Sequence, residues 1–166
     1  IANCFLRDFD DCVVIKGIKG WDTVNQHHIY VTGCTIWCDW GRGLEIGAET
    51  CADEYHDILW ADCDLIHGTH IHIDLHNGDR AWVHDMLVKD IRCEHSQYDM
   101  LPVFQEDMEA PYPAYGKSWQ PELIVSPIYD GPWSDDHRLG RVSDVRFEDI
   151  QILCDEDSPV PQCRFS

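Results

Sequence analysis

At 166 residues the chain is long enough to form one domain with a sizeable apolar core. Its formal net charge of −19 argues against binding to nucleic acid or to an anionic membrane surface, because both need clustered Lys and Arg. No apolar run is long enough to span a bilayer and no signal-peptide pattern is visible, so the compartment, cytoplasmic or secreted, stays open.

A repeated unit organises the first part of the chain, and its clearest copy is 28–47 (HIYVTGCTIWCDWGRGLEIG). Sliding this unit along the sequence aligns one column at steps of 30, 29, 28 and 59 residues: Cys4, Cys34, Cys63, Ile91 and Ile150. Two shorter columns follow from the same alignment, namely Val13, Leu44, Ile73 and Ile15, Ile46, Leu75. A constant period of this length is typical of solenoid proteins.

The chemistry of the repeat favours strands. Short runs with period-2 alternation recur at 58–60, 71–75 and 145–147, and no helical stripe is visible. Repeats of short strands without helices stack as the coils of a parallel β-helix, each burying its apolar side on its neighbours. The alternative is a β-sandwich with regularly spaced strands, but a sandwich has no reason to keep one side-chain register at one period.

The first repeat carries an acidic pair, Asp10-Asp11, directly before the apolar stretch 12–17. Two carboxyls at short range raise one another's pKa, which a general acid requires. A solvated turn is the alternative interpretation. The alignment favours a site, because it places the pair beside Gly41-Arg42 of the next repeat, on adjacent rungs of one surface.

Two motifs, FDDCVVIKG at 9–17 and WGRGLEIGAE at 40–49, resemble the pectin-lyase-like β-helix superfamily. The resemblance is closest to polygalacturonase-type glycoside hydrolases, whose motifs run DDC-x-x-I and GHG-x-x-IGS. Through the repeat, the resemblance covers most of the chain. Only two of the family's four signature blocks are present, and both are incomplete. The family's remaining catalytic Asp lies on a preceding coil, which this sequence lacks.

The resemblance implies that Asp10 is the general acid and that Asp11 belongs to the carboxylates that activate water. Arg42 replaces the His of the family motif and provides a permanent positive charge beside the acids. The family's Arg-Ile-Lys block, which grips a uronate carboxylate, aligns with 74–76 (DLH). We therefore expect a glycan other than plain galacturonan, and loss of catalysis remains an alternative.

Strand alternation predicts a polar outer face on the second and third repeats. The residues of this face, together with Trp40 in the turn that precedes 44–46, are the candidate substrate-binding residues: Trp40, Glu45, His70, His72, Asp74 and His76. Such a face can line a polar groove, bind a transition metal through imidazole and carboxylate, or remain a solvated surface. We favour the groove and predict no metal and no cofactor.

A long insertion at about 96–140 interrupts the repeat. Long excursions from a compact scaffold are usually lids or binding loops. This one is rich in aromatic residues: Tyr98, Phe104, Tyr112, Tyr115, Trp119 and Trp133. Their rings suit the apolar faces of sugars; the alternative is that they pack on the wall of the solenoid. Within the insertion, 122–129 (ELIVSPIY) is predicted to be a strand of another coil, which would account for the double step to Ile150. We interpret Asp135-Asp136-His137 as a loop turn.

Nine cysteines are present, and those in the inward column are expected to be reduced and to pack as small apolar side chains. The prediction is a single all-β domain over residues 1–166, a right-handed parallel β-helix of about five to six coils, with a polysaccharide or oligosaccharide as partner. Hydrolysis would proceed with inversion, between carboxyls about 6.5–9.5 Å apart. A non-catalytic carbohydrate-binding or assembly module is the alternative. Both ends lack polar caps, so we expect a fragment of a longer helix that stacks end to end.

Overall fold

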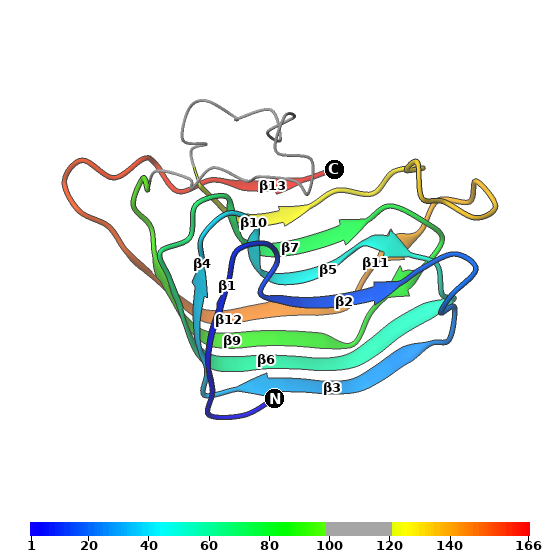
Figure 1. Ribbon diagram of the computed structural model, residues 1–166, viewed down its shortest axis with the longest axis horizontal. Coiled ribbons are helices and arrows are strands. Elements are labelled where there is room, and N and C mark those ends of the chain that lie inside the picture. Colours follow the sequence, from blue (N-terminus) through cyan, green and yellow to red (C-terminus); the bar gives the residue numbers. More distant parts are fainter. Residues whose placement is uncertain (99–120) are drawn as a thin grey trace, which may run out of the picture.

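The computed structural model describes residues 1–98 and 121–166 (Figure 1). Over this part of the chain all regular elements are strands, and there is no helix. No helix long and apolar enough to cross a membrane is therefore found among the residues described. Four aromatic residues of the predicted insertion lie outside the described residues: Phe104, Tyr112, Tyr115 and Trp119.

The strands form two sheets in which all registered pairings are parallel. The larger sheet contains β1 (Phe5–Asp8), β3 (Gln26–Thr32), β4 (Thr35–Cys38), β6 (Glu54–Ile66), β8 (Trp82–Val83), β9 (Met86–Glu94), β11 (Arg141–Val142) and β12 (Val145–Leu153). The smaller sheet contains, in spatial order, β13 (Cys163–Phe165), β10 (Glu122–Ser126), β7 (Ile71–Asn77), β5 (Arg42–Thr50) and β2 (Val13–Gly17).

The chain visits the two sheets alternately and advances in one direction through both. In the smaller sheet the spatial order from β2 to β13 is also the chain order, and β3, β6, β9 and β12 follow one another in the same way. Figure 1 shows these two stacks one above the other, with the N-terminus at the bottom and the C-terminus at the top. Each passage of the chain through both sheets therefore adds one strand to each stack, and we call one such passage a level.

The side-chain columns predicted from the repeat are confirmed by the register. Leu44 pairs with both Val13 and Ile73, and the parallel column through Ile46 is formed in the same way. In the larger sheet Ile91 pairs with Cys63 on one side and with Ile150 on the other. The central members of these columns, Leu44, Ile46, Cys63, Ile73 and Ile91, are 0 % exposed and form the core.

The step of 59 residues corresponds to one level and not to two. Ile150 lies directly beside Ile91, with no strand between β9 and β12. A strand does form within 122–129, but it is β10, which extends the smaller sheet beside β7. The extra residues are therefore insertions on both sides of β10 within one repeat, and the double spacing is not an additional coil.

Bends with a left-handed backbone recur at equivalent places on successive levels. One set has φ between 49° and 56° and lies directly before paired strand residues: His28, Asp57, Asp85 and Asp144. A second set has φ between 51° and 63°: Gly33, Asp62, Asp90 and Asp149. Asp, Asn and Gly tolerate this conformation better than most other residues, and Asp occupies three of the four positions in each set.

Replacing Asp90 by Val should destabilise the fold by about 1–2 kcal/mol, because a β-branched residue is strained at a φ of 52°. Asp90→Gly should be nearly neutral. Lys89→Val is the matched control, since Lys89 is the preceding residue of β9 and its side chain is 42 % exposed, and it should change stability by less than about 0.5 kcal/mol. Urea unfolding measures all three; equal losses in Asp90→Val and Lys89→Val would show that backbone strain is not the cause.

Candidate functional site

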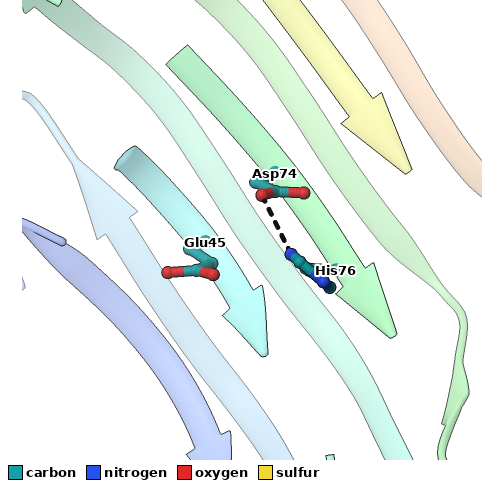
Figure 2. A group of neighbouring side chains, drawn as sticks. All are labelled: Glu45, Asp74 and His76. Carbon is teal, nitrogen blue, oxygen red and sulfur yellow. Dashed lines mark ion pairs between the residues drawn. The ribbon is translucent and has the colours of Figure 1, made fainter. Parts of the chain in front are cut away.

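The smaller sheet brings the predicted acidic residues of two repeats together. Glu45 of β5 pairs in register with Asp74 of β7, and Val14 of β2 occupies the same row on the other side. Figure 2 shows Glu45, Asp74 and His76 side by side on these two neighbouring strands. Glu45 is 1 % exposed and Asp74 is 0 % exposed, so this row of carboxyls is buried.

A close approach between two turns adds Asp11 to this group. The Oδ1 atom of Asp11 accepts a hydrogen bond from the backbone N–H of Arg42 at 3.0 Å. The approach requires the glycine at position 41, because a Cβ atom there would lie 2.6 Å from Asp11 Oδ1 and 2.7 Å from the Asp11 nitrogen. The turn before β5 is thereby fixed against the turn before β2.

Arg42 is the centre of the cluster. Its Nη1 lies 3.4 Å from Asp11 Oδ1, and its Nε lies 3.4 Å from Asp74 Oδ2 and 3.9 Å from Glu45 Oε1. A second cation, Lys16, lies 4.0 Å from Asp11 Oδ2 and 3.1 Å from Glu49 Oε2. Two basic side chains thus face four carboxyls, which leaves an excess of negative charge when all of them are ionised.

The surroundings give these carboxyls different proton affinities. Burial alone would raise the pKa of Asp11, but a hydrogen bond from Glu45 and the charges of Arg42 and Lys16 outweigh it, so the pKa of Asp11 lies below its usual value. Burial and the hydrogen bond to Asp11 raise the pKa of Glu45 to about 9. Glu45 is therefore protonated at neutral pH and donates to an ionised Asp11.

Asp10 lies beside this cluster, at the surface. It is exposed, and partial burial together with the negative charge of Asp11 raises its pKa. The two adjacent acids of the DDC motif therefore differ: the outer carboxyl holds its proton more tightly than a free Asp, and the inner one is kept ionised by Arg42.

A depression of about 320 Å³ lies beside Arg42, lined among others by His70, Asp74, His76, Tyr129 and Arg164. Of the candidate residues, Asp11, Arg42, Glu45, Asp74 and His76 come together as one cluster, and His70 shares the depression. Trp40 is partly buried in the turn before β5 and is not among the residues that line this depression.

The predicted outward orientation of His72 is wrong. Between the paired rows Arg42–Ile71 and Leu44–Ile73, His72 stands level with Leu123, which belongs to the hydrophobic core. Its ring is 5.6 Å from that of His95 and fills the space left by Gly68, where a Cβ would lie 2.5 Å from the imidazole. Strand alternation is interrupted at this level, since the adjacent residues Leu123 and Ile124 of the neighbouring β10 both belong to the core.

Two polar residues that line the depression were not predicted. Tyr129 lies after β10, and its hydroxyl is 2.7 Å from His76 Nε2. Arg164 of β13 forms two hydrogen bonds with Glu122, at 3.0 and 2.9 Å. Tyr129 lies within the predicted insertion and Arg164 after it, where the regular period no longer indicates which residues become neighbours.

No protein-family model, curated protein or solved structure matches this chain. Its function is therefore inferred from the chemistry of the site.

Replacing Arg42 by Met should destabilise the protein by about 3–5 kcal/mol, because it leaves Asp74 buried without the cation that pairs with it and Asp11 with only the more distant Lys16. Arg138→Met is the matched control. Arg138 pairs with Asp136 at 2.6 Å, but its side chain is 63 % exposed, and loss of such a surface pair should cost at most about 1 kcal/mol.

Thermal unfolding with a circular-dichroism readout compares the two variants. Adding Asp74→Asn to Arg42→Met should recover part of the lost stability, because it removes one of the unpaired charges. Equal effects of Arg42→Met and Arg138→Met would contradict the central position of Arg42.

Proposed function

We propose that the chain is a right-handed parallel β-helix that hydrolyses a polysaccharide other than plain galacturonan, with inversion at the anomeric carbon. The fold is supported by the stepwise advance of the chain through two parallel sheets and by columns that keep one register. A β-sandwich usually joins antiparallel neighbours, and the described strands contain no such registered pair.

The position of the Asp10-Asp11 pair carries the functional proposal. One carboxyl is at the surface and the neighbouring carboxyl is held against Arg42 on the adjacent strand. Hydrolysis with inversion needs one carboxyl that gives a proton and one that takes a proton from water. Two adjacent acids in opposite environments fit this division of roles.

In this mechanism Asp10 donates its proton to the glycosidic oxygen as the bond to the anomeric carbon breaks. Asp11 accepts a proton from the water that attacks the same carbon from the opposite side. Arg42 holds Asp11 in its ionised form and in position. The raised pKa of Asp10 and the lowered pKa of Asp11 agree with these roles.

The depression supports a substrate with many hydroxyl groups and little charge. Burial, with a smaller effect of Arg42, lowers the pKa of His70 to about 3, so its neutral ring can both donate and accept hydrogen bonds. The guanidinium groups that line the depression, Arg42 and Arg164, are both engaged with carboxylates. Neither is left over to bind a uronate.

A non-catalytic carbohydrate-binding module is the second candidate. The observation that favours it is the burial of Glu45 and Asp74, which share Arg42 with Asp11 and are closed to bulk water. In that case the depression would bind a glycan without cleaving it.

Asp10→Asn should reduce hydrolysis by at least about 100-fold, because Asn cannot protonate the leaving oxygen. The measurement is the release of reducing ends from a panel of neutral polysaccharides, with circular dichroism as the check on folding. Asp22→Asn, a change at a partly buried carboxyl beyond the other end of β2, is the control and should keep full activity.

The rate should fall as the pH rises, because Asp10 then loses its proton, and the decline should lie at higher pH than for an ordinary Asp. Unchanged turnover by Asp10→Asn would remove Asp10 from the mechanism. Binding of a glycan by the wild-type chain without release of reducing ends would favour the second candidate.

Polygalacturonate should bind at least about tenfold more weakly than the best neutral polysaccharide, because its carboxylates meet Asp74 and a strongly acidic protein. Affinity electrophoresis at two salt concentrations measures this difference. Tight binding of polygalacturonate that weakens with salt would mean that a basic subsite exists, and the proposed substrate class would be wrong.

A further inference from the structure

Three potential ligand atoms converge on β5 and β7 (Figure 2). Carboxylate oxygens of Glu45 and Asp74 and a ring nitrogen of His76 all lie within 4.8 Å of one another. The closest of the measured pairs is Asp74 Oδ2 to His76 Nδ1, at 3.4 Å. Ligands that share one zinc ion, with bonds of about 2.1 Å, lie roughly 3–4 Å apart, so the group needs only small adjustments to surround an ion.

Three buried carboxylate oxygens of this group lack hydrogen bonds. Asp74 is 0 % exposed, and neither of its oxygens has a hydrogen-bond partner within the described ranges. Glu45 Oε2 has no hydrogen-bond partner there either. Arg42 forms an ion pair with Oδ2 of Asp74 at 3.4 Å but donates no hydrogen bond to it. A buried carboxylate without hydrogen bonds is costly, and such groups in native proteins usually mark a missing water or ion.

His76 is held in the orientation that a metal ligand needs. Its Nε2 lies 2.7 Å from the Tyr129 hydroxyl. In the tautomer that donates from Nε2 to this hydroxyl, the lone pair of Nδ1 faces Asp74 Oδ2. Histidines that bind metals typically have their remote N–H fixed by a partner of this kind, which sets both the tautomer and the ring orientation.

The cluster also carries enough negative charge to bind a further cation. Asp11, Glu45, Asp74 and Glu49 face Arg42 and Lys16, so full ionisation leaves two negative charges unbalanced. One divalent ion would neutralise them.

We propose that Glu45, Asp74 and His76 form a binding site for one divalent transition-metal ion of the Zn²⁺ or Mn²⁺ type. The imidazole selects against Ca²⁺ and Mg²⁺, which prefer shells made of oxygen alone. Asp74 and His76 also line the depression, so the remaining coordination positions face the space where we place a glycan. The site goes beyond the proposed hydrolysis and replaces the expectation of a metal-free face.

The test uses the full chain, freed of metal with a chelator and then titrated with Mn²⁺ or Zn²⁺ by calorimetry. One equivalent should bind, and Ca²⁺ or Mg²⁺ at the same concentration should not compete. Asp74→Asn and His76→Gln should each weaken binding at least tenfold, and Tyr129→Phe by about tenfold through loss of the support to the imidazole. None of these measurements depends on hydrolysis.

His84→Gln is the matched control. His84 lies 2.8 Å from Asp85 and 4.0 Å from Glu54, so this variant removes an imidazole among carboxyls on the other sheet. It should leave binding unchanged; a loss equal to that of His76→Gln would place the ion elsewhere and overturn the assignment. So would the absence of saturable binding to the wild-type chain.

A spectroscopic measurement on the wild-type chain covers the case in which the Asp74 or His76 variant does not fold. Electron spin echo modulation of the Mn²⁺ complex should show the nitrogen of one bound imidazole. A spectrum without coupled nitrogen would exclude His76 as a ligand and overturn the proposal.

Discussion

The contact between Arg42 and the carboxyls of three different strands or turns is the interaction on which the site depends. It joins Asp11 before β2, Glu45 on β5 and Asp74 on β7, so three successive levels are fixed at one point. The contact forms because Gly41 lets the Asp11 turn approach to a distance that a side chain would forbid. Because the charges lie in a poorly solvated place, each partner strongly affects the proton affinity of the others.

The parallel register makes this contact possible. When each level adds the same number of residues, a side chain at one position meets its equivalents above and below, and polar rows form as regularly as apolar columns. The sequence repeat therefore predicted that Asp10-Asp11, Arg42, Glu45 and Asp74 would be neighbours as well as predicting the core. An Asp in the left-handed bend of successive levels, at 62 and 90, is a further signal that the sequence carries.

What the period could not predict lies where the period is broken. Tyr129 lies within the insertion and Arg164 beyond it, and no constant spacing relates them to His76 or Asp74. His72 was misplaced for another reason: strict alternation is interrupted at this level, where the adjacent residues Leu123 and Ile124 of the neighbouring β10 both belong to the core. Gly68 leaves room for the imidazole, and that space is visible only in three dimensions.

The buried carboxyls are not required by the sheet itself. Val14, Glu45, Asp74, Val125 and Arg164 occupy one row across β2, β5, β7, β10 and β13, so the same position holds valine on the level before and the level after the two carboxyls. Buried ion clusters are often less stable than apolar side chains of similar volume. Since valine fits this row, Glu45 and Asp74 are better explained by what they bind than by the stability of the fold.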